Sequence, residues 1–209
     1  MKKILITGGA GFIGSHLAET LAKNNKVVVI DKLIHGNKVK KHKNIELVKG
    51  DVRNLNLVRK LSKNCETIYH LAAIIGVDVV SERNLETMEY EFEGLKNICI
   101  SAKENKVKRI IYSSSSGVYG KLNYSKNVKE NAPVAPVSAY AIAKRSSELY
   151  LQNFYSEFKI SSVAVRLFNV YGPRQDKRMV IKRFIENAIK NEPLKIYGNG
   201  NQTRDFTYI

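Results

Sequence analysis

Short apolar runs alternate with longer segments of helical periodicity along most of the chain. The runs that predict β-strands are Ile4–Ile6, Val27–Ile30, Ile45–Val48, Thr67–His70, Arg109–Tyr112, Ser162–Leu167 and Leu194–Tyr197. The segments that predict α-helices are Ser15–Ala22, Leu55–Leu61, Leu85–Asn105, Ser138–Phe158 and Val180–Lys190. Strands that alternate with helices in this order predict an α/β fold built on a doubly wound parallel sheet.

Small or polar residues follow the carboxyl ends of the predicted strands. They are Gly8, Asp31, Asp51, Ala72, Ser115 and Asn169, the last of which begins a predicted loop, 169–177. Ligands of doubly wound sheets bind at this edge. Packing alone does not account for such residues at one edge, so the pattern predicts a binding site there.

A glycine-rich turn joins the first predicted strand to the first helix. Gly8, Gly11 and Gly14 recur at three-residue spacing, and Asp31 ends the next strand. Glycine lets a ligand approach the backbone closely, and the start of a helix attracts a phosphate. An acidic residue ~20 residues past such a turn can bind an adenosine ribose. A glycine turn without a ligand is the alternative, but this context predicts a dinucleotide site in a Rossmann-like domain.

The chain of 209 residues has 35 Lys and Arg against 19 Asp and Glu, a formal charge of +16. This excess raises the question of a nucleic acid or membrane partner. Most of it is lysine spread along the chain, and the one cluster, 38–43, lacks the interleaved aromatic residues of a single-strand binding surface. We therefore attribute the excess mainly to a lysine-rich proteome and expect neither partner, with anionic phosphate ligands as a secondary reason for the positive charge.

Cysteine usage and hydropathy bear on location. Cys65 and Cys99 are far apart and lack metal-ligand spacing, which favours buried thiols in a reducing compartment and no metal site. The apolar run after Lys3 is too short for a signal peptide, and no run approaches the ~18 apolar residues of a membrane span. We expect a cytoplasmic protein.

A candidate catalytic group lies on the helix predicted at 138–158. Tyr140 and Lys144 are four residues apart and share a helix face. An ammonium beside a phenol favours the phenolate and lowers its pKa from ~10, which gives a base near neutral pH. Ser115, at the end of the preceding strand, can bond the same substrate hydroxyl. A surface pair and an exposed serine loop are the alternatives.

With these residues, the chain resembles the extended short-chain dehydrogenase/reductase family, in its NAD-dependent nucleotide-sugar epimerase and dehydratase branch. The matching segments are Thr7–Gly14, Asp31, 51–53, 70–73, 112–120, Tyr140–Lys144, 166–174 and 197–206. These motifs occur in the family's order and run almost from end to end, so the resemblance is specific.

The resemblance implies roles for individual residues. The implied NAD-binding residues are Gly8, Gly11, Phe12, Ile13, Asp31, Lys32, Asp51, Val52, Leu71, Ala72, Ala73, Ser113, Tyr140 and Lys144. Tyr140 is the implied base, Lys144 holds the nicotinamide ribose, and Ser115 is the third catalytic member, which also contacts substrate. Asn169 and Arg204 are the implied ligands of the sugar nucleotide's diphosphate.

Within this branch, the resemblance favours an epimerase. Dehydratases of the family usually carry Asp-Glu where this chain has Ser116 and Gly117, and elimination of water needs that extra acid and base. We expect C4 epimerisation of a nucleotide diphosphate sugar, of the UDP-glucose/UDP-galactose type, through a transient keto sugar. The alternatives are another reductase, dehydratase or decarboxylase of the family, or a non-catalytic NAD-binding fragment. Homodimerisation is compatible with the resemblance.

Three departures from the family pattern qualify this expectation. Relatives often have Asn where Glu91 stands and Lys where Ile75 stands, so NAD is expected to bind more weakly or through other contacts. Lys32, beside Asp31, leaves NADP open as an alternative. Relatives also continue beyond Ile209. We therefore expect an NAD-binding domain at 1–168 and, at 169–209, the start of a substrate lobe that is truncated relative to the family.

Overall fold

The computed structural model describes residues 1–74, 84–121, 128–196 and 198–209. The chain folds into two compact units, Met1–Arg166 and Leu167–Ile209. None of the helices within the described ranges is long and apolar enough to cross a bilayer.

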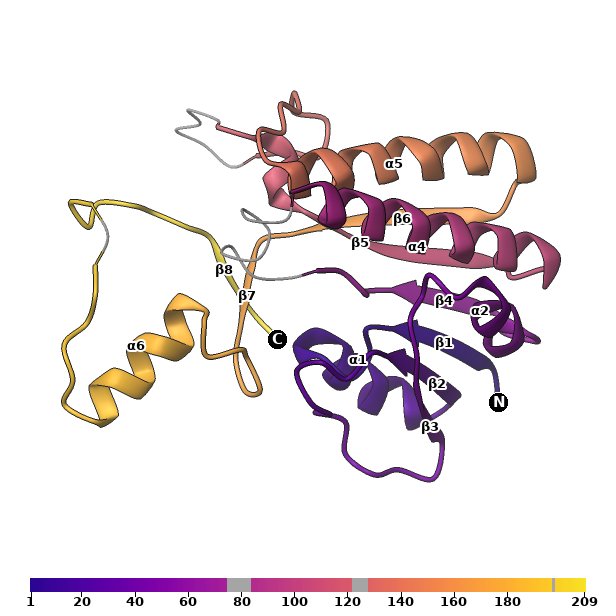
Figure 1. Ribbon diagram of the computed structural model, residues 1–209, viewed down its shortest axis with the longest axis horizontal. Coiled ribbons are helices and arrows are strands. Elements are labelled where there is room, and N and C mark those ends of the chain that lie inside the picture. The colour runs from indigo at the N-terminus through magenta and orange to yellow at the C-terminus, as the bar shows by residue number, and fades with distance from the viewer. Residues whose placement is uncertain (75–83, 122–127, 197) are drawn as a thin grey trace. The chain divides into compact units, whose positions relative to one another are not determined.

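The first unit is built on a sheet with the order β3-β2-β1-β4-β5-β6. Its strands are β1 Lys3–Thr7, β2 Lys26–Asp31, β3 Ile45–Lys49, β4 Thr67–His70, β5 Arg109–Ser115 and β6 Ser161–Leu167. β1 pairs in parallel with β2 on one side and with β4 on the other (Figure 1). The order reverses at this point, and doubly wound sheets bind dinucleotides in the crevice that the reversal creates.

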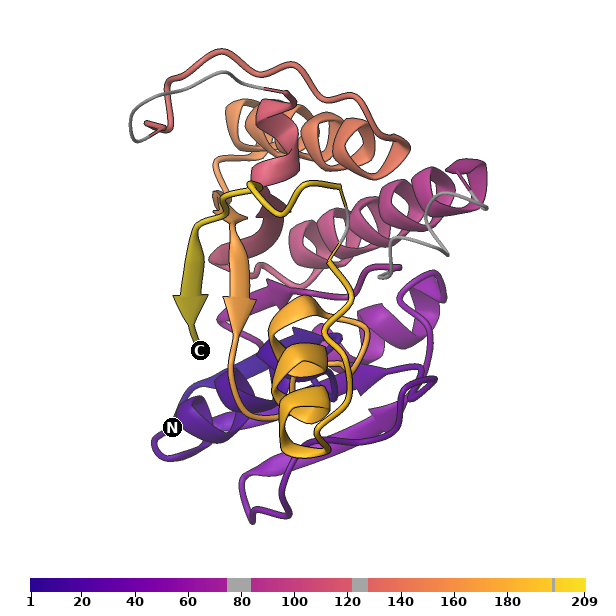
Figure 2. The same ribbon diagram turned by 90° about the vertical axis from the view of Figure 1, so that its left-hand side faces the viewer.

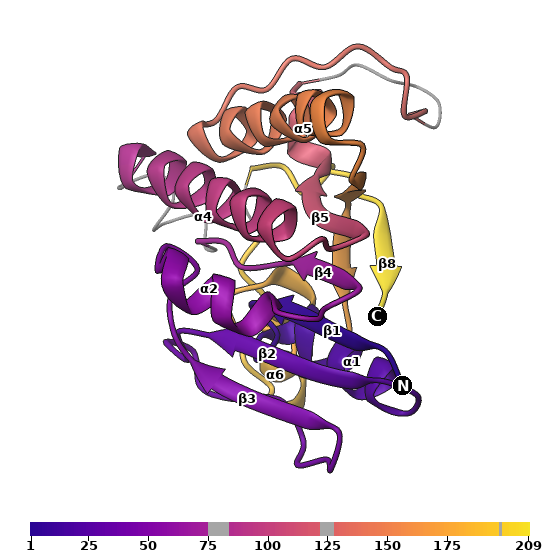
Figure 3. The ribbon, with the colours of Figure 1, turned by 90° about the vertical axis from the view of Figure 1, so that its right-hand side faces the viewer.

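Helices cover both faces of this sheet. They are α1 Phe12–Ala22, α2 Leu55–Ser62, α4 Asn84–Glu104 and α5 Ala139–Phe158, with a short 3₁₀ helix, η1, at Ser116–Tyr119. α2, α4 and α5 lie on one face, and α4 and α5 run side by side (Figure 3). α1 lies on the other.

Alternate strand residues feed two separate apolar cores. Leu5, Val28 and Ile30 pack toward α2, α4 and α5, whereas their neighbours Ile4 and Val29 pack toward α1. This is expected of a parallel sheet that is covered on both faces, because successive side chains point to opposite sides. The near-continuous apolar runs of the sequence therefore reflect burial on two faces.

The second unit contains β7 Asn169–Tyr171, α6 Val180–Ile189 and β8 Phe206–Tyr208. β7 and β8 form a two-stranded parallel sheet in which Asn169 is opposite Phe206 (Figure 2). The ring of Tyr171 contacts those of Phe206 and Tyr208 edge to face.

The predicted fold class and six main strands are confirmed, and four boundaries or elements differ. α1 begins at Phe12 rather than Ser15, because Gly11 already acts as its N-cap. β5 continues to Ser115, because Ser114 faces the core and its hydroxyl donates to Glu148. The predicted loop at 169–177 begins with β7, which pairs with distant residues. The strand predicted from Leu194 is absent over 194–196, which are exposed, and Tyr197 lies outside the described residues.

Candidate functional site

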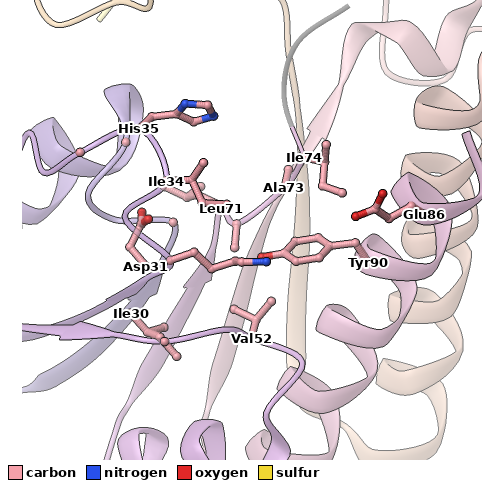
Figure 4. A pocket seen from close by; sticks show the side chains of 16 residues that line it. Ile30, Asp31, Ile34, His35, Val52, Leu71, Ala73, Ile74, Glu86 and Tyr90 are labelled. Atoms are coloured by element: carbon pink, nitrogen blue, oxygen red, sulfur yellow. The ribbon is translucent and has the colours of Figure 1, made fainter. Parts of the chain in front are cut away.

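A cavity of about 410 Å³ opens at the carboxyl edge of the sheet in the first unit. Asp31, Val52 and Tyr90 approach it from β2, from the loop after β3 and from α4 (Figure 4). Of the residues expected to bind NAD, it is lined by Gly8, Gly11, Asp31, Lys32, Val52, Leu71, Ala72 and Ala73. The loops that follow four neighbouring strands thus converge on one hollow, at the reversal in strand order.

The glycine turn packs against the loop after β4 as closely as backbone allows. Gly8 has φ +67°, and a Cβ on it would lie 2.7 Å from the Ala72 nitrogen. A Cβ on Gly14 would lie 2.4 Å from the Gly8 oxygen. Only glycine fits these two positions, and the result is a tight turn that leads directly into α1. Phe12 and Ile13 form the first turn of that helix, whose backbone N–H groups lack intrahelical partners.

Asp31 supports the glycine turn from the end of β2. Its Oδ2 accepts a hydrogen bond from the Ala10 nitrogen at 3.0 Å, and its Oδ1 accepts one from the Leu33 nitrogen at 2.8 Å. Each carboxylate oxygen can accept a further bond. The carboxylate is therefore fixed in orientation while it retains acceptor capacity toward the cavity that it lines.

A cluster of charges surrounds Asp51 on the loop after β3. The Asp51 carboxylate lies 3.1 Å from the Lys32 ammonium and 2.9 Å from the Arg53 guanidinium. Burial would raise the pKa of Asp51, but the bonds from Arg53 and Lys32 outweigh it and lower that pKa to about 2. Both cations also lie over the ring of Tyr90, at 5.3 and 5.1 Å from its centroid. Lys32 is thus held by groups of the protein itself.

The expected catalytic residues lie where β5 meets the start of α5. Ser138 caps α5 by accepting a hydrogen bond from the Ala141 nitrogen, and Tyr140 and Lys144 follow in the first two turns. The Lys144 ammonium lies 5.5 Å from the centroid of the Tyr140 ring. The Ser115 hydroxyl accepts a bond from the Gly117 nitrogen, and η1, which begins just after it, packs against α5.

Lys144 is fully buried and paired with an acidic residue. Its ammonium lies 2.9 Å from Glu91 Oε2, and the two side chains are 1% and 0% exposed. It also lies 4.7 Å from the centroid of the Tyr112 ring. Burial alone would lower the pKa of Lys144, but the attraction of Glu91 and of the two tyrosines raises it above its usual range.

The other expected site residues are placed as follows. Ser113, in β5, donates from its hydroxyl to the His70 oxygen. In the second unit, the Asn169 amide donates to the oxygen of Asp205, the residue after Arg204, so Asn169 and Arg204 lie near each other although they are far apart in sequence. The Arg204 guanidinium donates to the Thr203 oxygen. Ile75 lies outside the described residues.

The comparisons with known proteins agree with this geometry. The sequence profile of the NAD dependent epimerase/dehydratase family matches residues 4–209. The chain belongs to this family. It is 39% identical, over 99% of its length and 69% of the relative's, to a Methanocaldococcus jannaschii protein provisionally named a UDP-glucose 4-epimerase. It is 37% identical, over 100% of its length and 68% of the relative's, to a UDP-N-acetyl-alpha-D-glucosaminuronate decarboxylase of Bacillus cytotoxicus.

Solved structures of family members extend the comparison. A UDP-N-acetylglucosamine 4-epimerase from Methanobrevibacter ruminantium, in complex with UDP-N-acetylmuramic acid, superposes with a TM-score of 0.93 at 37% identity, covering 99% of this chain and 69% of its own. Relatives also include dehydratases, so the family comprises NAD-dependent enzymes that modify nucleotide sugars in several ways. NAD is the family's cofactor, and solved relatives contain it.

The residues of this chain fit NAD. The Gly8–Gly14 turn brings backbone to a cavity surface with no side chain in between, and unpaired N–H groups of α1 suit a pyrophosphate. Asp31 keeps acceptor capacity for a ribose, and Val52 and Leu71 supply apolar walls. Eight of the fourteen residues expected to bind NAD thus line one cavity.

The pattern of the sequence did not predict some residues at or beside this cavity. Tyr90 and Glu86 of α4 line the cavity, although no spacing relates them to the glycine turn. Thr7 and His70 tie β1 to β4, with 2.7 Å between Thr7 Oγ1 and His70 Nδ1. The same hydroxyl accepts from the Ala72 nitrogen. The sequence offers one signal for this pair: each of the two apolar strands, β1 and β4, ends in a polar residue, Thr7 and His70.

Proposed function

We propose that the chain is an NAD-dependent epimerase of a nucleotide diphosphate sugar, most simply a UDP-sugar, and that it inverts C4 through a transient keto sugar. The observation that carries this proposal is the Tyr140–Lys144 pair at the start of α5, which packs against β5, the strand that ends in Ser115 at the carboxyl edge of the sheet. A phenol, a buried ammonium and a hydroxyl at that edge suit the removal of a proton from a secondary alcohol.

The chain's own residues would act as follows. Tyr140 takes the proton of the C4 hydroxyl, and the Lys144 ammonium stabilises the phenolate before transfer. Ser115 bonds the same sugar oxygen and holds it in line with Tyr140. Bound NAD supplies the acceptor and later the donor of the C4 hydride. For inversion, the keto sugar must rotate within the site, so that the hydride returns to the other face of C4, before Tyr140 returns the proton.

The segment after β5 supports epimerisation over dehydration. Ser116 and Gly117 begin η1, and neither side chain can supply the acid and base that elimination of water requires. A Cβ at Gly117 would lie 3.3 Å from the Ser115 hydroxyl and 3.5 Å from the Ala141 Cβ, so this position has little room for a larger group.

Decarboxylation of a nucleotide-linked uronic acid is the second candidate. The similarity to the Bacillus cytotoxicus decarboxylase, at 37% identity, favours it. Such a reaction can begin with the same oxidation at C4, because a ketone β to a carboxylate promotes loss of carbon dioxide. The same Tyr140 and Lys144 would serve both reactions, and the outcome depends on the sugar.

Substrate binding is proposed to involve the second unit. Asn169 and Arg204 offer an amide and a planar guanidinium, which suit the oxygens of a diphosphate.

Cys65 and Cys99 are free and buried, which supports the expected reducing, cytoplasmic location. A homodimer remains part of the proposal.

A turnover screen with NAD tests the proposed function. The chain is incubated separately with UDP-glucose, UDP-galactose, UDP-N-acetylglucosamine and UDP-glucuronic acid, and products are separated by chromatography and weighed by mass spectrometry. Epimerisation gives a new compound of unchanged mass, decarboxylation a loss of carbon dioxide, and dehydration a loss of water. A product of changed mass in place of an isomer, or no product from any sugar, would contradict the epimerase proposal.

A further inference from the structure

The contact between Glu91 and Lys144 brings a second ionisable group to the expected catalytic pair. Glu91 lies on α4 and Lys144 on α5, two helices that pack side by side. Their charged atoms are 2.9 Å apart, and both side chains are almost completely buried. A buried charge is costly unless it is compensated, so each of these residues depends on the other.

Other contacts fix the Glu91 carboxylate in place. The Tyr112 hydroxyl, from β5, donates to Glu91 Oε2 at 3.1 Å, so this oxygen binds a phenol and an ammonium together. Among the described residues, Glu91 Oε1 is buried without a hydrogen-bond partner. The carboxylate is therefore oriented by one oxygen, and that oxygen faces Lys144.

The remaining groups around Lys144 do not neutralise it. His70, from β4, is fully buried; burial and the charge of Lys144 lower its pKa to about 3, so it carries no charge near neutral pH. Burial raises the pKa of Tyr112 above its usual range, so that phenol is also neutral. Tyr140 is the remaining ionisable partner of the ammonium.

Glu148, one turn beyond Lys144 on α5, is engaged elsewhere. Its carboxylate pairs with Arg145 and Arg166, at 2.9 and 2.8 Å, and accepts from Ser114. The negative charge that acts most directly on Lys144 is therefore that of Glu91.

We propose that Glu91 is a positioning residue that holds the Lys144 ammonium and sets how strongly this ammonium promotes ionisation of Tyr140. The inference rests on the proposed role of Tyr140 as the base. An ammonium shared with a carboxylate stabilises a neighbouring phenolate less, and the carboxylate also repels that phenolate directly. Tyr140 should therefore ionise at a higher pH than it would beside an unpaired Lys144.

Removal of the Glu91 charge should move this ionisation to lower pH. In Glu91→Gln, the amide keeps most of the volume and can still accept from Tyr112, but the negative charge is gone. We expect the midpoint of Tyr140 ionisation to fall by about one pH unit. Glu89→Gln is the matched control, because it removes the same charge from an exposed position on α4 and should leave the midpoint unchanged.

Ultraviolet titration of tyrosinate measures this midpoint without substrate or cofactor. The curve of each protein is compared with that of the same protein carrying Tyr140→Phe, so the difference isolates Tyr140 from the other tyrosines. Circular dichroism at each pH checks that both members of a pair are folded. An equal or higher midpoint in Glu91→Gln would overturn the proposal.

A second variant keeps the test decisive if Glu91→Gln does not fold. Tyr112→Phe removes the hydroxyl that donates to Glu91, which leaves the carboxylate to Lys144 alone. The Tyr140 midpoint should then rise, and an unchanged or lower midpoint would contradict the proposal. Because the titration uses the free chain, failure of the proposed function would appear as absent turnover with the shift intact. Failure of this inference would appear as turnover without a shift.

Discussion

The Lys32 ammonium lies 3.1 Å from the Asp51 carboxylate, on the loop after the neighbouring strand β3. Lys32 follows Asp31 directly, and its charge taken alone would favour a 2′-phosphate ligand. The ion pair with Asp51 and the contact with the Tyr90 ring hold this ammonium, whereas Asp31 lines the cavity with spare acceptor capacity. The balance of charges at this end of the cavity therefore favours a ribose hydroxyl over a phosphate.

We predict that NAD binds more tightly than NADP. Like charges ~4 Å apart cost on the order of 1–4 kcal/mol between water-like and surface dielectric, so Asp31 should repel a 2′-phosphate by about that much. Calorimetric titration with each cofactor measures the difference. Asp51→Asn should release Lys32 and reduce the difference in affinity between NAD and NADP, whereas Lys32→Ala should leave this difference almost unchanged. Equal affinities in the parent protein would show that Lys32 outweighs Asp31.

Replacement of Tyr140 by Phe should abolish turnover and leave NAD binding intact. The substitution removes one hydroxyl from a half-buried ring, so packing is retained, and loss of a general base typically costs ~10²–10⁴ in rate. Turnover and NAD affinity are measured on the same preparation. Tyr155→Phe, at an exposed position on the same helix, should retain full activity. Near-normal turnover by the Tyr140 variant would remove this residue from the mechanism.

The cofactor-binding part of the site was more predictable from sequence than the rest. The glycine turn, Asp31 and the strand ends are local patterns, and the carboxyl ends of parallel strands meet at one edge whatever the details of packing. The Glu91–Lys144 pair depends instead on how two helices far apart in sequence pack side by side. β7 likewise became a strand because it pairs with the distant β8, a contact that leaves no periodic signal in a three-residue segment.

The charge cluster at Asp51 makes a prediction about acid stability. The pKa of this carboxyl is lowered to about 2 from 3.8, so its contribution to stability is present above pH ~4 and is lost as the pH falls toward 2. After allowance for solvent screening, that contribution is about 1–2 kcal/mol. Urea unfolding of the parent and Asp51→Asn should differ by this amount at pH 6 and should converge near pH 2. A difference that persists at low pH would contradict the assignment to this ionisation.

Asn169 and Arg204 are the proposed diphosphate ligands of the second unit. The Asn169 amide, at the start of β7, donates to the Asp205 oxygen, so Asn169 lies next to the segment that contains Arg204, two residues before β8. Arg204 is exposed and donates to the Thr203 oxygen, and no ion pair joins it to Asp205 among the described residues of this unit. Its guanidinium therefore retains donors for a phosphate oxygen pair.

Arg204→Ala should weaken UDP binding by about tenfold or more, because a charge-assisted bond to phosphate contributes ~1.5–3 kcal/mol. Isothermal titration with UDP, in the presence of NAD, measures the change. Lys190→Ala removes an exposed positive charge from the end of α6 and should have little effect, which separates a specific contact from general attraction of an anion to a basic chain. If Arg204→Ala binds UDP as tightly as the parent protein, Arg204 does not hold the diphosphate, and its exposed position has no role in substrate binding.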